Sequence, residues 1–331
     1  MTFVHHSIER LFLLCVISCF VIIMCQDCFD DAIQHDKYME HQVFRKFGSP
    51  SLYECVSECL TSSVCLSFAF QHKTQTCFLN NNSSSQVSIS PRSGFHFSDI
   101  QQWTKALSGP CVVMSCPVAT SCQVDRHGRA TCAPEFSGCG FPPYVPWAIM
   151  TYDGHYKGAV ARYTCKKDYI ACHRRITSVC QASEQWNSVT GLCRKFRWKN
   201  PRVNGDYDLP CGPQSKFSIL VLATPNSVKG FSLNTKADAD VTFHARFGDG
   251  FLTDKIVINS MFRGRWGVEK FRGYKITVGK QSQMQVSLHN GVYELMVDNI
   301  VVKYRERQPG ILPDTIRVEG DALVSLIQVS I

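Results

Sequence analysis

The cysteines constrain the fold of this chain more than any other feature, because they stop well before its C-terminal end. The 331 residues include 18 cysteines, and the last of them is Cys211. Small modules bury too little apolar surface to be held by a core alone, and disulfides commonly make up for the missing core. The sequence therefore predicts a multidomain protein, with small disulfide-rich modules first and one larger domain, held by its core, at the end.

The first 25 residues have the pattern of a secretory signal peptide. Arg10 precedes the apolar run Leu11–Cys25, as a charged region precedes the hydrophobic part of such peptides. A membrane anchor is the competing interpretation, but a spanning helix normally needs about 20 apolar residues. We expect cleavage just after Cys25 or Gln26, and a mature protein that is secreted and extracellular.

Secretion determines how the remaining cysteines are interpreted, because an oxidising compartment favours disulfides over metal ligation. The signal segment holds Cys15, Cys19 and Cys25, so an odd number of cysteines remains after cleavage. We therefore expect one cysteine without an intramolecular partner, as a free thiol or in a disulfide-linked dimer.

Catalytic and nucleic-acid-binding patterns are missing from the sequence. It contains no H-E-x-x-H, G-x-S-x-G or glycine-rich phosphate loop, and its eleven histidines are scattered. The net charge is +8, but Lys and Arg form no dense run. We expect a protein that is not an enzyme, binds no nucleic acid, and has no metal and no cofactor.

The first cysteine framework lies in residues 27–98 and reads Cys55-x3-Cys59-x5-Cys65-x11-Cys77. A helix over 52–60 would place its first two cysteines one turn apart on one face. Short strands are predicted over 66–70 and 76–79. The segment resembles a PAN/apple domain, an α+β fold, and this resemblance implies the disulfides Cys55–Cys77 and Cys59–Cys65.

Two smaller features belong to the same segment. Cys28 stands where the family has an outer cysteine pair, but it has no obvious partner before Cys111. Asn81 and Asn82 each begin an N-x-S sequon, so one of them can carry a glycan on a solvated loop.

Residues 108–133 form a second framework, with the spacing Cys111-x4-Cys116-x5-Cys122-x9-Cys132. This spacing resembles the first part of an EGF-like module, although the family's final C-x-C is missing and position 134 is proline. The resemblance implies the pairs Cys111–Cys122 and Cys116–Cys132. We interpret this partial module as a spacer.

Residues 139–193 form a third framework, which begins CGFPP and ends with a tryptophan and a cysteine. It resembles a sushi (complement control) module, a small β unit. The resemblance implies the disulfides Cys139–Cys180 and Cys165–Cys193 and a buried indole at Trp186. Three cysteines remain unassigned, of which two can pair: Cys28, Cys172 and Cys211.

Residues 198–331 are predicted to be all-β. Short segments that alternate or are rich in β-branched residues lie between Gly, Asn and Asp, which indicates a β-sandwich. The predicted strands are 218–224, 240–247, 254–260, 274–279, 284–290, 293–298 and 314–320.

This last segment resembles the galectin family over its whole length. The pieces that carry the resemblance occur in the family's order: DVTFHARFGDG, DKIVINS, GRWGVEK, MQVSLHNGVYEL and DTIRVEGDALVSLIQV. The resemblance implies a jelly-roll sandwich that binds carbohydrate. The family's sugar motif reads H-x-N-x-R, then V-x-N, then W-x-x-E-x-R, and here falls on residues 242–246, 257–259 and 266–271.

The residues themselves also favour a sugar site. Positions 242, 244 and 246 alternate, so we expect all three side chains on one face of a strand. Polar side chains supply the directional hydrogen bonds that hydroxyls need, and an indole supplies a flat apolar surface. The predicted carbohydrate-binding residues are His244, Arg246, Asn259, Trp266 and Glu269.

Three departures from the family motif leave the identity of the glycan open. Thr242 replaces the leading His, His244 replaces the middle Asn, and Phe271 replaces the closing Arg. Lys270 and Arg272 are candidates to substitute for that arginine. The first two changes affect the groups that, in the family, read the hydroxyls of galactose.

Two functions follow from these patterns. The first is a secreted lectin of adhesion or innate immune recognition, whose C-terminal domain binds galactoside-type or related glycans on glycoproteins or glycolipids. Its apple and sushi modules would then bind protein partners or act as spacers. The alternative is an extracellular matrix or interaction protein whose galectin-like module has lost sugar binding.

Overall fold

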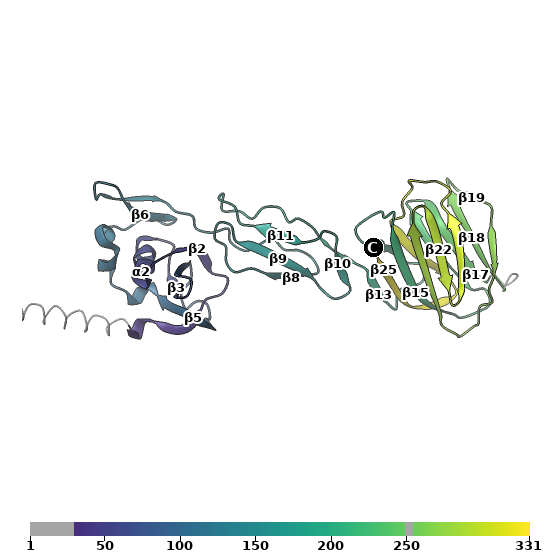
Figure 1. Cartoon of the computed structure of the whole chain (residues 1–331), viewed down its shortest axis with the longest axis horizontal. Coiled ribbons are helices and arrows are strands. Elements are labelled where there is room, and N and C mark those ends of the chain that lie inside the picture. Colours follow the sequence, from purple (N-terminus) through teal and green to yellow (C-terminus); the bar gives the residue numbers. More distant parts are fainter. Residues whose placement is uncertain (1–29, 249–253) are drawn as a thin grey trace, which may run out of the picture. The chain divides into compact units, whose positions relative to one another are not determined.

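The computed structural model of the chain describes residues 30–248 and 254–331 (Figure 1). These residues belong to two compact units. One contains the chain up to residue 144 with segments 150–162 and 177–189, and the other contains 145–149, 163–176 and 190–331. The predicted signal peptide and Cys28 lie outside the described residues. Within those residues, no helix has both the length and the apolar character needed to cross a membrane.

The first unit is built on a five-stranded antiparallel sheet that packs against one helix. The strand order is β1-β5-β3-β4-β2. The helix α2 (Leu52–Thr61) begins at Ser51, whose Oγ accepts a hydrogen bond from the backbone N–H of Glu54. Its buried face carries Cys55, Val56 and Cys59. The strands are β1 (Gln34–Tyr38), β2 (Val43–Gly48), β3 (Ser67–Gln71), β4 (Thr76–Asn80) and β5 (Ser90–Asp99).

The helix and the two strands predicted in this segment are present. The disulfides Cys55–Cys77 and Cys59–Cys65 join α2 to the sheet and to the loop before β3. The 3-10 helices η1 (Asp30–Ala32) and η2 (Ile100–Gln102) lie at either end of the sheet segment.

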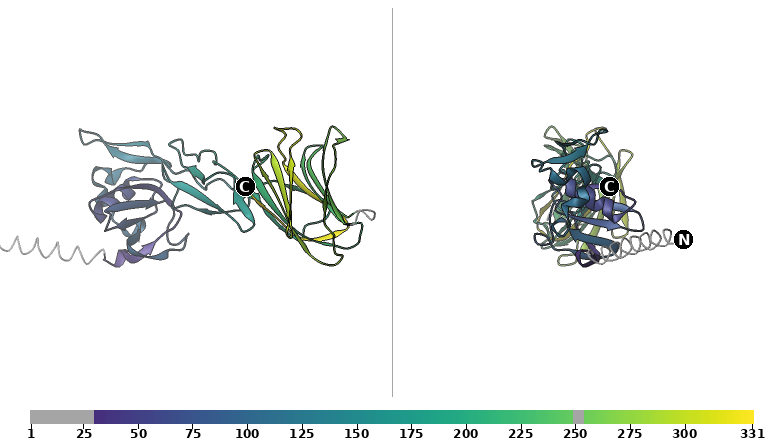
Figure 2. Two further views of the ribbon diagram at one scale, coloured as in Figure 1. Left: turned by 45° about the vertical axis from the view of Figure 1, so that its right-hand side comes forward. Right: turned by 90° about the vertical axis from the view of Figure 1, so that its left-hand side faces the viewer.

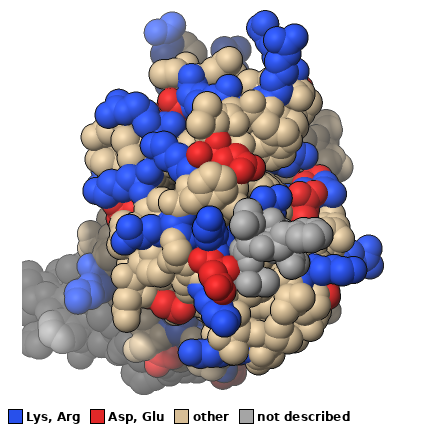
Figure 3. Space-filling view, turned by 90° about the vertical axis from the view of Figure 1, so that its right-hand side faces the viewer, with Lys and Arg blue, Asp and Glu red and all other residues tan. Residues whose placement is uncertain are grey.

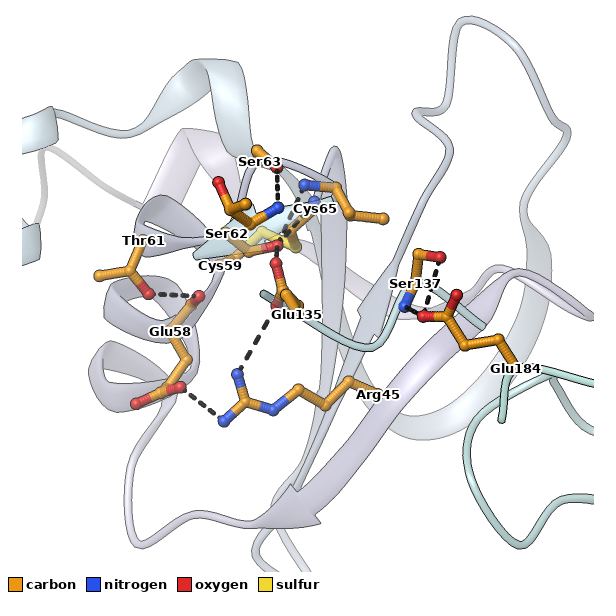
Figure 4. Close-up of polar contacts among 12 residues, drawn as sticks. Arg45, Glu58, Cys59, Thr61, Ser62, Ser63, Cys65, Glu135, Ser137 and Glu184 are labelled. Carbon is orange, nitrogen blue, oxygen red and sulfur yellow. Dashed lines mark hydrogen bonds and ion pairs between the residues drawn. A yellow bond between two sulfur atoms is a disulfide. The ribbon is translucent and has the colours of Figure 1, made fainter. Parts of the chain in front are cut away.

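The hairpin of β6 (Thr120–Val124) and β7 (Ala130–Pro134) follows the 3-10 helix η3 (Lys105–Val113) and packs on the same unit. Its disulfides are Cys111–Cys122 and Cys116–Cys132. The Oε2 atom of Glu135 accepts a 2.6 Å hydrogen bond from Ser62 Oγ at the end of α2 (Figure 4). The backbone N–H of Ser63 donates to the backbone oxygen of Thr120. The hairpin is therefore attached to the first domain, which differs from the spacer that we expected.

Residues 139–193 contain two small sheets. One has the order β11-β9-β8 and the other pairs β10 with β12. The disulfides are Cys139–Cys180 and Cys165–Cys193. Trp186 is half-buried instead of fully buried, and its indole N–H donates to the backbone oxygen of Gly140. The strands are β8 (Ala148–Thr151), β9 (Val160–Cys165), β10 (Tyr169–Ala171), β11 (Ile176–Val179) and β12 (Cys193–Lys195).

The C-terminal part of the second unit is a sandwich of two antiparallel sheets, visible as two layers in Figure 2. The six-stranded sheet has the order β13-β25-β15-β21-β22-β23. Its strands are β13 (Arg197–Lys199), β15 (Phe217–Pro225), β21 (Ser282–His289), β22 (Val292–Val297), β23 (Ile300–Arg305) and β25 (Ala322–Ser330).

The other sheet has the order β14-β24-β16-β17-β18-β19, and β20 also pairs with β18. Its strands are β14 (Asp206–Asp208), β16 (Phe231–Ala237), β17 (Asp240–Phe247), β18 (Lys255–Phe262), β19 (Arg265–Trp266), β20 (Lys270–Gly273) and β24 (Thr315–Gly320). Apolar side chains from both sheets meet between them, among them Phe243, Phe247, Ile258 and Tyr293.

One predicted strand of the sandwich is wrong. Residues 274–279 form a loop and a turn, although the segment YKITVG alternates like a strand. Ile276 still reaches the core, but it does so from the loop, and Gly279 takes a left-handed φ of 78°. The alternation in this segment reflects anchoring of an irregular loop by the side chains of Tyr274 and Ile276, both of which pack on the core.

Every cysteine from Cys55 to Cys211 is in a disulfide. The seventh bond joins Cys172 to Cys211, two of the three cysteines that the sequence left unassigned. This bond connects the loop after β10 to the segment between β14 and β15. The unpaired cysteine and the disulfide-linked dimer stay predictions that concern Cys28.

Candidate functional site

The outward face of the seven-stranded sheet gathers most of the predicted site residues. Along β17, Ala245 and Phe247 lie in the core, so His244 and Arg246 project from the other side of the sheet. His244 is the cross-strand neighbour of Asn259 on β18, and neighbours of this kind share a face. Trp266 of β19 pairs with Met261, two residues along β18, and therefore lies on the same face.

His244 is held by Asn234, a residue of β16 that the sequence did not single out. Their Nδ1 and Oδ1 atoms are 2.6 Å apart. The side-chain nitrogen of Asn234 donates to the carboxylate of Glu319 on β24, at 2.9 Å. A carboxylate only accepts hydrogen bonds, so this contact fixes which end of the Asn234 amide faces the imidazole.

The same contact assigns the tautomer of His244. Because Asn234 Oδ1 is an acceptor, Nδ1 of the neutral imidazole must carry the proton. Burial, together with the positive charge of Arg246, lowers the pKa of His244 to about 4. At neutral pH the ring is therefore uncharged, and its Nε2 atom is a hydrogen-bond acceptor.

His244, Asn234 and Glu319 form a row of polar side chains across the sheet, and this row continues on β24 and β14. Arg317 of β24 forms an ion pair with Glu319, with Nε 2.7 Å from the carboxylate, and its Nη1 donates to Asp206 of β14 at 3.2 Å. The sequence missed this row because cross-strand register is not visible in it. The signal that the sequence offered was the alternation of the polar residues Ser232 and Asn234 with the apolar residues Phe231 and Leu233 in β16.

Trp266 presents an exposed aromatic surface at the end of this face. Its side chain is 51% exposed. The His244 ring meets it edge to face, with ring centroids 5.0 Å apart. An indole in this position is not part of the core, so its apolar surface is free to contact a ligand.

Asn259 supports Trp266 and faces little solvent. It is 3% exposed, and its Nδ2 atom donates to the backbone oxygen of Gly267 at 3.1 Å. Its Oδ1 atom accepts from the backbone N–H of Ser260. Both ends of the amide thus hold the segment that carries the indole. Glu269 follows in the exposed segment between β19 and β20.

The expectation that Thr242 shares the face of His244 is wrong, because a β-bulge interrupts β17. Thr235 pairs with Phe243 and Lys236 with Val241, which leaves Thr242 as the extra residue. Its hydroxyl points between the sheets, where it bonds to Thr235 and accepts from Tyr293 Oη at 3.0 Å. Thr242 is 3% exposed and belongs to the interior.

The register of β20 also rules out the expected substitutes for the missing arginine. Phe271 pairs with Val257, the partner of Arg246, so Phe271 lies on the site face. Lys270 pairs with the core residue Ile258, and Arg272 pairs with Ile256. Both cations therefore project from the opposite side of the sheet.

The other predicted sites are placed as follows. Asn82 donates from its amide nitrogen to Gln42 Oε1 at 2.6 Å, and both Asn81 and Asn82 are partly exposed. Glycosylation at these positions stays a prediction. Among the described residues, no group of three or more His, Cys, Asp or Glu side chains is arranged to hold a metal ion.

Two family models match separate parts of the chain. Residues 28–100 match the PAN domain, and residues 204–329 match the galactoside-binding lectin family. The chain therefore contains a PAN domain and a C-terminal galectin domain. A search of curated proteins found no match.

Solved galectin structures resemble about two fifths of the chain. The crystal structure of the Caenorhabditis elegans galectin LEC-6 is 20% identical and covers 41% of this chain and 96% of its own, with a TM-score of 0.37. A double variant of human galectin-16 is 17% identical and covers 40% and 99%, with a TM-score of 0.35. Sheep galectin-11, in complex with glycerol, is 16% identical and covers 39% and 99%, with a TM-score of 0.33.

Proposed function

We propose that this protein is a secreted lectin whose C-terminal domain binds galactoside-type or related glycans. The observation that carries the proposal is the exposed indole of Trp266 beside the neutral imidazole of His244, on the face that also carries Arg246. The match of residues 204–329 to the galactoside-binding lectin family supports it.

The three side chains supply complementary contacts for a sugar ring. A pyranose has one face of C–H groups, which packs on the flat surface of Trp266. Its hydroxyls both donate and accept hydrogen bonds. His244 Nε2 accepts from one hydroxyl, and the guanidinium of Arg246 donates to another or to the ring oxygen.

Selectivity in this site differs from that of the family motif. The asparagine that the motif places at position 244 has a donor and an acceptor, whereas the neutral His244 offers an acceptor at Nε2. Thr242 is buried and contributes no contact. The site therefore recognises fewer hydroxyls directly, and we expect it to accept galactosides together with related sugars.

The N-terminal modules support an extracellular setting. Seven disulfides between Cys55 and Cys211 are typical of a protein made in an oxidising compartment. Residues 108–133 and 139–193 have the cysteine pairing that the EGF-like and sushi resemblances imply, and PAN and sushi modules suit adhesion or innate immune recognition. Secretion follows from the pattern of residues 1–25 and is part of the proposal.

A glycan-array screen of the intact secreted chain tests the proposal. The whole chain is needed because Cys211 of the galectin domain pairs with Cys172 outside it. We expect binding to galactose-containing glycans that W266A abolishes. The matched control is W147A, because Trp147 has a similar exposure of 54% but stacks on Tyr169, whereas Trp266 contacts His244. A folded wild-type chain that binds no glycan would refute the proposal.

A further inference from the structure

We propose that the galectin domain holds the acidic group of a glycan, a sulfate ester or a carboxylate, in a basic cavity next to Trp266. This inference rests on the proposed function, because the cavity and the sugar site share the indole as a wall. It names a substrate class, anionic glycans, that the neutral face of the site does not suggest.

The cavity has a volume of about 550 Å³ and lies at the edge where the two sheets meet. One side is the segment that begins at β19, and the other is β23 with the residues after it. Its volume falls in the range of small-molecule sites, roughly 300–1,000 Å³. The lining residues are Trp266, Gly267, Val268, Lys270, Tyr304, Arg305 and Arg307.

The lining is strongly positive, because Lys270, Arg305 and Arg307 are cationic and none of the other lining residues is acidic. Like charges around one cavity raise the local potential and favour an anion that neutralises them. On the end of the domain that Figure 3 shows, Lys and Arg side chains are more abundant than Asp and Glu side chains.

Two of the cations are held in place by contacts within the domain. Arg307 Nη1 donates to the backbone oxygen of Ser260 at 2.9 Å, and its guanidinium lies over the ring of Phe262. Lys270 Nζ lies 5.7 Å from the ring centroid of Tyr304. Tyr304 is in turn tied to Ser260 by a 2.7 Å hydrogen bond between their hydroxyls. The donors are therefore partly organised before a ligand arrives.

Gly267 makes room for Arg307. A Cβ atom at this position would lie 2.2 Å from Arg307 Nη1, which is closer than any real contact. The atom that would have to move is the end of a flexible side chain, so alanine at 267 displaces the guanidinium and keeps its charge. G267A thus tests whether the position of the Arg307 guanidinium matters, because the variant moves this group without removing its charge.

Titration calorimetry on the intact secreted chain tests the inference. The probes are lactose, lactose sulfated at the 3′ or 6′ position, and 3′-sialyllactose. We expect at least one charged form to bind about tenfold or more tightly than lactose, with an advantage that falls as NaCl rises from 50 to 300 mM. The advantage should be lost in R305Q, which leaves lactose affinity unchanged, and reduced in G267A. The control is K303Q, because Lys303 pairs with Glu294 and does not line the cavity.

Each outcome decides a different point. A charged probe that loses its advantage in R305Q supports the inference, and the probe that shows it distinguishes sulfate from carboxylate. Equal affinity for lactose and all charged forms, or an advantage that R305Q leaves intact, overturns the inference while sugar binding stands. A chain that binds none of the probes contradicts both this inference and the proposed function.

Discussion

His244 and Asn234 face each other across β17 and β16, with Nδ1 and Oδ1 2.6 Å apart. This contact fixes the tautomer of the imidazole and directs Nε2 to accept hydrogen bonds. It also makes the site depend on Glu319, which orients the Asn234 amide from a third strand. Three of the strands of the sheet thus cooperate to present a single acceptor atom.

Glycan affinity should change little between pH 8 and pH 5. The pKa of His244 is lowered to about 4 by burial and by Arg246, so the ring stays neutral across this range. Calorimetry at several pH values measures the affinity. A loss of binding with a midpoint near pH 6.5, the ordinary value for histidine, would contradict the assigned state of the ring.

Domain stability should fall as the pH decreases from about 6.5 toward 4. In this window the unfolded chain binds a proton at His244 and the folded domain does not, so stability rises with pH by at most about 1.4 kcal/mol per unit. Thermal unfolding of H244Q should lose this part of the slope. An identical slope in the variant and the wild type would show that other groups cause it.

Removing the Asn234 amide should weaken glycan binding about tenfold and destabilise the domain. N234A leaves the buried His244 Nδ1 and one Glu319 oxygen without this partner, which costs about 1–3 kcal/mol. N226A is the matched control, because the Asn226 amide also donates to a carboxylate, that of Asp321, and lies outside the site. Affinity that N234A leaves at the wild-type level would mean that His244 needs no support.

Peptide mapping under non-reducing conditions should recover Cys172 linked to Cys211. The sequence separation is 39 residues, and loss of a bond of this kind typically costs about 2–4 kcal/mol through the unfolded state. The double variant C172S/C211S should therefore lower the unfolding temperature of the galectin domain. Peptide mapping that finds free thiols at both positions would contradict the Cys172–Cys211 disulfide.

The hairpin of β6 and β7 should become sensitive to protease in E135Q. The Glu135 side chain is 4% exposed and lies 3.9 Å from Arg45, and burial raises the pKa of its carboxyl group. The Glu135 carboxylate accepts a hydrogen bond from the Ser62 hydroxyl. E135Q removes the negative charge of this buried acceptor and so weakens the contact. E58Q is the control, because Glu58 pairs with the same arginine at an exposed position. Equal cleavage of both variants would show that Glu135 does not hold the hairpin.

Local patterns in the sequence predicted which residues of β17 share a face, and they singled out one exposed tryptophan. His244 and Arg246 lie on one face because side chains two apart in a regular strand must do so. Trp266 was found because it stands among glycines and cations. Thr242 was misplaced because a bulge depends on how two strands pair, and a single strand's sequence does not carry that information.

Features that depend on contacts between distant segments could not be predicted from the sequence. Cys172 and Cys211 belong to different modules, so no family spacing pairs them. Lys270 and Arg305 are 35 positions apart, and the sequence shows them only as two of its scattered basic residues. The fold brings both side chains to one cavity. Asn234 gained its role from the register that places it beside His244.

The most direct test of the account is an NMR titration of the intact chain with lactose, following the indole N–H signals of its five tryptophans. The signal of Trp266 should shift with saturation, whereas those of Trp147 and Trp186 should stay in place. Binding that shifts another indole and leaves Trp266 unchanged would contradict the central claim that this side chain forms the sugar site.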